Sequence, residues 1–364
     1  MKTVRVDLKQ RSYDIIIGHN ILPEISGRLK QLNIGKDAVI ITNKKIKGLL
    51  GGKIGALLKK SAITFRFETV PDSERSKSKE IAFRTIDKIS KYARKKEVFI
   101  IALGGGVIGD LSGFIASIYK RGLPYIQIPT TLLAQIDSSI GGKVAIDLDY
   151  GKNLVGSFYQ PAMVICDTSL LQTLPKTEIQ SGLSEALKYG MIQDANLFAY
   201  IEKKWRDLTR LKTKPVEKVV YKCAAIKAKI VSLDEREKKG LRTILNFGHT
   251  VGHAIETAGG FKKYNHGKAV ALGMLAAAKI SADLKISQAP QLHERLKKIL
   301  DKIKLPTQLS GVKPNAVFKA LEFDKKFIRG KNRFVLPVKT GRVIIKTAIP
   351  EETIKESISW LMRK

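Results

Sequence analysis

The sequence has 364 residues, 44% of them hydrophobic, and carries a formal net charge of +33. That length exceeds one ordinary hydrophobic core and favours two domains in a globular protein. The apolar run at 98–119 is broken by Asp110 and several glycines, which excludes a membrane-spanning helix. The alternating residues 1–8 indicate a strand rather than a signal peptide. The two cysteines, Cys166 and Cys223, do not form a disulfide framework and are typical of a cytoplasmic protein.

The positive charge is dispersed along the chain. Lysine pairs stand at 44–45, 59–60, 203–204 and 297–298, without interleaved aromatic residues and without a basic tail. Clustered cations would indicate nucleic-acid binding, whereas dispersed ones are typical of solvated helix faces. We therefore expect neither nucleic acid nor a membrane as a partner. A basic protein does attract small anionic molecules.

Strands and helices alternate in the first half. Apolar runs at 37–42, 63–70, 97–103 and 125–128 predict strands, and helical patterns such as 76–95 separate them. This order is typical of a mostly parallel sheet with helices on both faces, as in a Rossmann-like nucleotide-binding domain.

From about residue 175 the pattern becomes mostly α-helical. Predicted helices cover 177–191, 216–237, 242–257, 267–284 and 288–303. A hairpin is expected at 333–338 and 342–346, followed by a terminal helix. The sequence thus predicts an α/β domain at 1–175 and a mostly α-helical domain at 176–364.

A glycine-rich string follows the predicted strand at 97–103. Gly104, Gly106 and Gly109 formally match G-x-G-x-x-G, and a helical pattern comes next. Glycines let backbone amides approach a pyrophosphate, and a helix N-terminus offers partial positive charge there. The string lies on a late strand, whereas the usual dinucleotide fingerprint lies on the first. A structural tight turn is the alternative interpretation.

Metal-ligand residue types gather in the second half. Glu185 lies in an apolar helical pattern, and His249, His253 and His266 follow downstream. One Glu and two His on separate segments suit a divalent metal with an open position. His249 and His253 are four apart on one predicted helix, so a second interpretation makes both of them ligands, as in H-E-x-x-H. Lys188, three residues after Glu185, forms either an intrahelical ion pair or a contact to substrate.

Two further strings, at 128–143 and 151–161, are rich in hydroxyls, glycines and lysines. Such residues suit an anion-lined cleft, although each string alone could be a solvated loop.

Together these motifs resemble the 3-dehydroquinate synthases, of the sugar-phosphate cyclase group, over nearly the whole chain. The resemblance is densest at 104–175, 181–190 and 234–274. It implies an NAD-binding α/β domain, a helical metal- and substrate-binding domain, an active site in the cleft between them, and a homodimer. It also implies a lyase of the shikimate pathway of aromatic amino-acid biosynthesis. That lyase converts 3-deoxy-D-arabino-heptulosonate 7-phosphate to 3-dehydroquinate plus phosphate.

The resemblance assigns roles residue by residue. The matching metal ligands, for Zn²⁺ or Co²⁺, are Glu185, His249 and His266. The matching NAD positions are Asp72, Glu74, Lys77, Gly106, Val107, Ile108, Gly109, Asp110, Thr130, Thr131, Lys143, Lys152, Leu170, Leu171, Gln172 and Thr173. The matching substrate positions are Asp137, Lys143, Lys152, Asn153, Lys188, Lys227, Arg242, Asn246, His253 and Lys325. Arg121 matches an arginine that the family lends to the partner subunit. The chain departs from the family pattern at Ser73, Lys229 and Lys268, and none of these is a matched position.

The implied mechanism uses NAD catalytically. A substrate hydroxyl is oxidised, phosphate is eliminated, the hydride returns, and an aldol step closes the carbocycle. His253 would then act on a proton or on phosphate instead of binding metal. Two enzyme alternatives share this scaffold: a 2-deoxy-scyllo-inosose or valiolone-type synthase, and a polyol dehydrogenase that consumes NAD stoichiometrically. A basic nucleic-acid-binding protein is the alternative from a different class.

Overall fold

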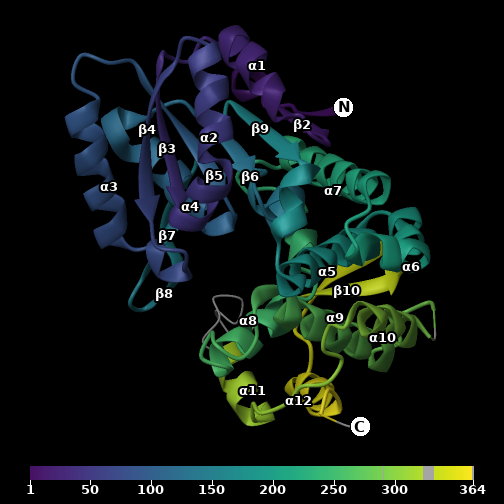
Figure 1. Cartoon of the computed structure of the whole chain (residues 1–364). Helices are drawn as coiled ribbons and strands as arrows, with labels where there is room; N and C mark the ends of the chain where they lie inside the picture. The colour runs from purple at the N-terminus through teal and green to yellow at the C-terminus, as the bar shows by residue number, and fades with distance from the viewer. Residues whose placement is uncertain (290, 323–331, 363–364) are drawn as a thin grey trace. The chain divides into compact units, whose positions relative to one another are not determined.

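The computed structural model describes residues 1–289, 291–322 and 332–362 (Figure 1). The chain packs into two compact units. The first unit comprises Met1–Leu174 and Val216–Arg236, and the second comprises Pro175–Pro215 and Glu237–Lys364. Helix α7 (Thr213–Leu233) therefore belongs almost entirely to the first unit.

The first unit is built on a seven-stranded sheet with the order β1-β2-β9-β6-β5-β3-β4. Its strands are β1 (Lys2–Val6), β2 (Tyr13–Gly18), β3 (Asp37–Asn43), β4 (Thr64–Val70), β5 (Val98–Gly104), β6 (Tyr125–Pro129) and β9 (Met163–Asp167). β1 pairs antiparallel with β2, and every other pairing in this sheet is parallel. The predicted Rossmann-like, mostly parallel sheet is confirmed.

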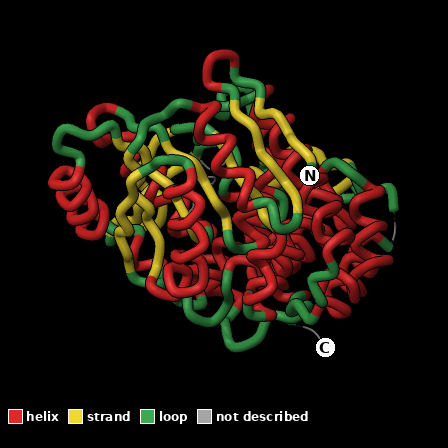
Figure 2. Tube along the Cα trace, turned by 45° about the horizontal axis from the view of Figure 1, so that its top comes forward, coloured by secondary structure: helices red, strands yellow, loops and turns green. Residues whose placement is uncertain are grey.

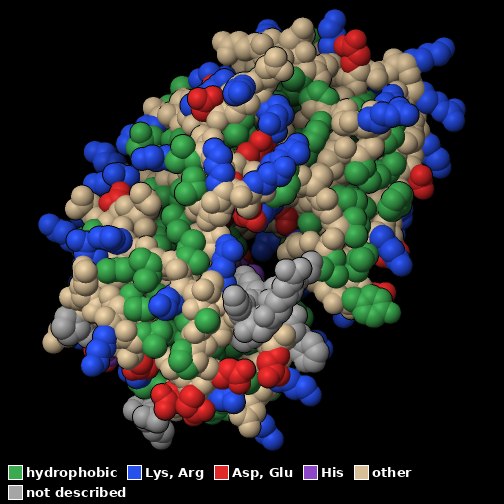
Figure 3. Space-filling model, turned by 180° about the vertical axis from the view of Figure 1, so that it is seen from behind, with side chains coloured by type: hydrophobic (Ala, Val, Ile, Leu, Met, Phe, Trp, Pro, Cys, Tyr) green, Lys and Arg blue, Asp and Glu red, His purple; other side chains and the backbone are tan. Residues whose placement is uncertain are grey.

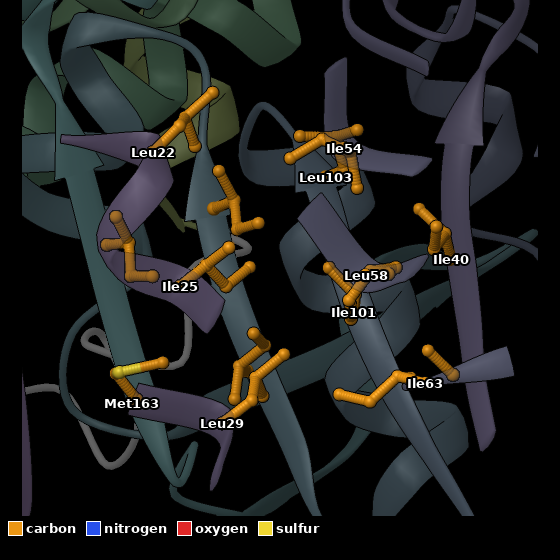
Figure 4. Close-up of a cluster of buried hydrophobic side chains, with 14 of the residues drawn as sticks. Leu22, Ile25, Leu29, Ile40, Ile54, Leu58, Ile63, Ile101, Leu103 and Met163 are labelled. Carbon is orange, nitrogen blue, oxygen red and sulfur yellow. The ribbon is translucent and has the colours of Figure 1, made fainter. Parts of the chain in front are cut away.

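Each face of this sheet has its own apolar core because side chains alternate along a strand. On one face, Ile40 and Ile101 pack with Ile54 and Leu58 of α2 (Lys44–Lys60) and with residues of α1 (Ile25–Leu32) (Figure 4). On the other face, the neighbouring strand residue Ile100 packs with α3 (Lys79–Tyr92) and α4 (Gly106–Ile118). Burial on both sides explains why these strands are continuous apolar runs.

The stretch at 128–161 is more ordered than a solvated loop. β7 (Lys143–Leu148) and β8 (Gly151–Phe158) form an antiparallel hairpin. Val144 and Ile146 of β7 are buried in the core formed with α3 and α4. β8 is exposed along most of its length, which leaves its polar residues accessible.

The second unit is mostly α-helical, as predicted, and helices dominate outside the main sheet (Figure 2). Its helices are α5 (Lys176–Ile192), α6 (Ala195–Thr209), α8 (His249–Ala258), α9 (His266–Asp283), α10 (Leu292–Ile303), α11 (Pro314–Glu322) and α12 (Glu351–Trp360). The predicted hairpin is present as β10 (Arg333–Lys339) and β11 (Arg342–Thr347).

One predicted helix, at 242–257, is wrong in its first half. Residues Leu241–Asn246 form a short 3-10 helix, and α8 begins only at His249. Gly248 separates them with a φ of 78°, a left-handed conformation that glycine adopts without a steric penalty. This break makes His249 the first residue of α8.

The surface agrees with the dispersed charge of the sequence. Lys and Arg side chains are spread over the face seen in Figure 3. Within the described ranges, no helix combines the length and apolar character needed to cross a bilayer.

Candidate functional site

Glycines bring α8 and α9 into close contact. A Cβ on Gly273 would lie 1.9 Å from the carbonyl oxygen of Gly248, and one on Gly252 would lie 3.1 Å from that of Ala269. Side chains at these positions would separate the two helices. Because His249 and His266 are the first residues of α8 and α9, this packing brings their rings to a centroid distance of 5.2 Å.

The start of α9 is also fixed against α5. Asn265 caps α9 through its side-chain oxygen, which accepts from the Lys268 amide at 3.0 Å. A Cβ on Gly267 would lie 2.2 Å from Cα of Ser181, and the Gly267 amide donates to the Ser181 hydroxyl at 3.1 Å. Glu185 lies one helical turn after Ser181, on the same face. His266 is thereby held beside Glu185.

Glu185, His249 and His266 form a site with the geometry of a metal centre. Oε1 of Glu185 lies 3.4 Å from Nε2 of His249 and 3.4 Å from Nε2 of His266. Four ligands placed tetrahedrally about 2.1 Å from Zn²⁺ are separated by about 3.4 Å. Oε1 of Glu185 is buried and accepts no hydrogen bond in the described structure, whereas Oε2 forms an ion pair with Lys188. The residues therefore fit a divalent cation, because the buried Oε1 still needs a partner.

The pKa values of the two histidine ligands are shifted in opposite directions. Burial lowers the pKa of His249 well below its usual value, and the nearby Lys188 lowers it further. This leaves a neutral imidazole, the form that binds metals. Burial also opposes the charging of His266, but Glu185 and Glu256 outweigh it and raise the pKa of His266 to about 10. Because metal binding requires the neutral ring, a bound cation would replace that proton.

Of the other predicted residues of the second unit, Lys188 and His253 lie beside the triad. Lys188 is 2% exposed, and its Nζ lies 2.5 Å from Oε2 of Glu185. His253 is exposed, one turn after His249, with ring centroids 5.3 Å apart. Arg242 is buried in the 3-10 helix before α8, with Nε 3.6 Å from Oε1 of Glu237. Asn246 ends the same 3-10 helix. Lys325 lies outside the described residues.

In the first unit, the predicted NAD residues follow the carboxyl ends of parallel strands. β5 ends at Gly104, and α4 begins at Gly106 with no side-chain cap, which leaves backbone amides available to an anion. Thr130 and Thr131 follow β6, and the Thr130 amide donates to the Gly104 carbonyl at 2.9 Å. The predicted stretch Leu170, Leu171, Gln172 and Thr173 lies in the 3-10 helix after β9. Ligands of open α/β sheets bind at this edge.

Lys77 is the centre of a polar cluster at the same edge. Its ammonium lies 2.8 Å from Asp110, 3.7 Å from Glu74 and 4.0 Å from Asp147, and it donates to the side-chain oxygen of Asn153. Burial alone would lower the pKa of Lys77, but these carboxylates raise it above its usual value. The structure thus brings a predicted nucleotide residue and a predicted substrate residue into direct contact.

The remaining predicted residues of the first unit lie on several different elements. Lys227 of α7 is buried and donates to the backbone carbonyl of Asp137 at 2.7 Å and to its carboxylate. Lys152 lies 3.8 Å from Glu74. Lys143 begins β7 on the exposed side, and Arg121 is exposed in the turn after α4.

Three residues near these sites were missed by the sequence reasoning. Asn43 caps α2 and donates to Asp72 at 2.7 Å. Asp147 accepts from the Asn153 amide at 2.7 Å. Glu256 lies 3.4 Å from His266. Only Glu256 had a sequence signal, because it stands seven residues after His249 and three after His253 on the same helix face.

Comparisons with known proteins agree along the whole chain. The model of the 3-dehydroquinate synthase N-terminal region matches residues 67–181, and that of the C-terminal region matches residues 182–327. A 3-dehydroquinate synthase of Desulforamulus reducens is 43% identical, covering 99% of this chain and 100% of that protein.

Two solved structures have similar folds. A 2-deoxy-scyllo-inosose synthase complexed with carbaglucose-6-phosphate, NAD⁺ and Co²⁺ is 25% identical, with a TM-score of 0.89 over 98% of this chain and 99% of that one. A 2-epi-5-epi-valiolone synthase of Streptomyces hygroscopicus, with NAD⁺ and Zn²⁺ bound, is 24% identical, with a TM-score of 0.87 over 98% of each chain.

Proposed function

The chain belongs to the 3-dehydroquinate synthase family, and from that membership and the geometry above we propose which of its residues carry out the reaction. The enzyme is an NAD- and divalent-metal-dependent lyase. It converts 3-deoxy-D-arabino-heptulosonate 7-phosphate to 3-dehydroquinate and phosphate, in the shikimate pathway. The curated synthase is 43% identical, whereas the two solved cyclases with other products are 24–25% identical, which favours this substrate.

The metal ligands are Glu185, His249 and His266. One observation carries this assignment: a single buried oxygen of Glu185 lies 3.4 Å from both Nε2 atoms. We do not assign His253 as a ligand, because the group that contains the buried Glu185 comprises only His249 and His266 besides it, and His253 is exposed. As the exposed imidazole next to the triad, His253 is instead available to transfer a proton or bind phosphate.

The NAD site is the carboxyl edge of the first unit's sheet. The α4 N-terminus at Gly106–Asp110 offers its amides to the pyrophosphate, and Thr130 and Thr131 offer hydroxyls beside it. Asp72, Glu74 and Lys77 follow β4, and residues 170–173 follow β9, at the same edge. We also propose an NAD-binding domain at 1–175 and a metal- and substrate-binding domain at 176–364, except that Val216–Arg236 packs with the first unit.

The substrate is a polyanion, and the remaining predicted residues are mostly cations and hydrogen-bond donors. Lys143, Lys152 and Lys227 serve from the first unit, and Lys188 and Arg242 from the second. Arg242 suits a carboxylate because its guanidinium donates two parallel hydrogen bonds. When bound, the metal supplies Lewis acidity, and NAD takes up and returns a hydride. The contribution of the protein is to orient the hydroxyls and phosphate of the substrate.

Incubation with 3-deoxy-D-arabino-heptulosonate 7-phosphate tests this function. We expect phosphate and 3-dehydroquinate in equal amounts with catalytic NAD and no net NADH. Chelation should abolish turnover, and Zn²⁺ or Co²⁺ should restore it. Accumulation of one NADH per turnover would identify a dehydrogenase instead. A carbocycle formed only from a different sugar phosphate would identify another cyclase.

We further propose a homodimer in which Arg121 serves the site of the partner subunit. Arg121 is exposed, with a φ of 65°, in a turn between α4 and β6 that presents its side chain to solvent. Loss of one charge-assisted contact should cost about 1.5–3 kcal/mol of substrate binding in Arg121→Ala.

Mixed dimers test this role directly. Inactive Arg121→Ala subunits mixed with inactive His249→Ala subunits should regain activity, because one of the two sites in a hybrid dimer keeps both residues. Subunit exchange without returning activity would refute the role in trans. We also propose a cytoplasmic setting, supported by Cys166 and Cys223, which are both buried and free.

A further inference from the structure

The second ring nitrogen of each histidine ligand also has a partner. Nδ1 of His249 lies 3.1 Å from the carbonyl oxygen of Phe247. Nδ1 of His266 lies 3.4 Å from Oε2 of Glu256. Both partners can only accept a hydrogen bond, so each Nδ1 donates, and Nε2 is the nitrogen of each ring that a metal can bind in place of a proton.

Glu256 is held in place by α8. It lies seven residues after His249, about two helical turns, and so on the same face of the helix. Its side chain is 11% exposed. Glu256 therefore contacts His266 of α9 from the helix that carries the other histidine ligand.

The geometry of the His266 ring distinguishes Glu256 from the metal ligands. His266 faces Glu185 with Nε2 and Glu256 with Nδ1, and these two nitrogens point to different sides of an imidazole. One cation cannot bind both nitrogens. A second possible metal group, His253, Glu256 and His266, shares His266 with the triad. It contains the exposed His253, whereas Glu185, at the centre of the triad, is buried.

We propose that Glu256 is a positioning residue that holds His266 in the tautomer and orientation needed for metal binding. This inference rests on the proposed triad and adds to it a carboxylate that acts through His266. Partners of this kind raise metal affinity by about 10–100-fold in other metal sites. Glu256→Ala should weaken Co²⁺ binding by that factor. Glu256→Gln, which keeps a carbonyl acceptor, should lose less.

Co²⁺ titration of the apo enzyme measures this effect through visible absorption in competition with a chelator. His249→Ala tests the triad itself and should lose specific binding. Glu294→Gln is a matched control, because Glu294 lies 3.3 Å from Nε2 of His293, a histidine outside the triad. It should bind Co²⁺ as the unmodified enzyme does.

A spectroscopic measurement separates positioning from mere stability. The chain has five histidines, so ¹⁵N-histidine labelling of the Zn²⁺-loaded enzyme gives a simple spectrum. We expect a protected Nδ1–H resonance for His266 that Glu256→Gln retains and Glu256→Ala loses.

Each possible result distinguishes between roles of Glu256. If Glu256→Ala lost metal as completely as His249→Ala, Glu256 would be a ligand and the proposal would be wrong. If it lowered thermal stability but left Co²⁺ affinity and the resonance unchanged, its role would be structural and the proposal would also be wrong. If His249→Ala kept full affinity, the triad and the proposed metal site would fail together.

Discussion

Replacing Gly267 with alanine tests whether helix packing positions the metal ligands. A Cβ at this position would lie 2.2 Å from Cα of Ser181 and 2.6 Å from its Oγ. The nearer atom belongs to the backbone, so a change of side-chain rotamer cannot relieve the clash. The start of α9 must move away from α5, and His266 moves with it. We expect Gly267→Ala to weaken Co²⁺ binding and lower stability.

The size of the stability loss follows from comparable overpacked sites. Inserting a methyl group into a tightly packed interior costs about 1–3 kcal/mol. In a unit of this size each kcal/mol lowers Tm by about 2–4 °C. Thermal unfolding of the apo protein measures the loss of stability. Co²⁺ titration, at a temperature where the variant is folded, measures the effect of moving His266.

Gly52→Ala is the matched control. Gly52 lies inside α2, and a Cβ there meets no atom within 4 Å. Because alanine favours helix, this variant should be unchanged or more stable by about 0.5–1 kcal/mol. If Gly267→Ala matched the unmodified protein in both Tm and Co²⁺ affinity, the contact between α9 and α5 would not position His266.

Three further predictions follow from single contacts. His249→Ala should lose bound metal, while His253→Ala should keep it and lose turnover; equal metal loss by elemental analysis would refute the division of roles. Lys77→Met removes the ammonium that faces Asp110 and leaves this partly buried carboxylate unpaired, so it should cost about 1–3 kcal/mol in urea unfolding and weaken NAD binding. Unchanged NAD affinity would exclude this cluster from the cofactor site. Asp167→Asn should destabilise the first unit by about 2–4 kcal/mol, because the buried carboxylate accepts hydrogen bonds from the amides of Asn20, Leu22 and Ser169. Unchanged stability would show that these hydrogen bonds do not stabilise the unit.

The sequence predicted the elements that have strong periodicity. The strands at 37–42 and 97–103 are buried on both faces, so their apolar runs were unambiguous. The hairpin β7–β8 was missed because β8 contains exposed polar residues and two glycines, which local patterns cannot distinguish from a loop. The break before α8 was missed because Gly248 is tolerated within a helical pattern, whereas its left-handed backbone and its close contact with Met274 of α9 belong to the tertiary structure.

The candidate site was predictable to a similar degree. Residue types and family resemblance identified Glu185, His249 and His266, and the structure brings the three together. What the sequence did not contain is the pair of close helix contacts, at Gly267 and Gly273, that sets the distances between them. Glu256 was missed because its spacing from His249 and His253 indicates only a shared helix face, and its contact with His266 of α9 is tertiary.

The charge balance of the triad explains why a second carboxylate lies beside it. His249 and His266 stand at helix N-termini, where each helix places about half a positive elementary charge. Lys188 adds a full ammonium, 2.5 Å from Glu185. A divalent cation there is opposed by all three, and Glu185 alone supplies one negative charge. Glu256 supplies a second without occupying a ligand position. With a cation bound there, positive charge would still remain in excess, which would favour an anionic substrate over a neutral one.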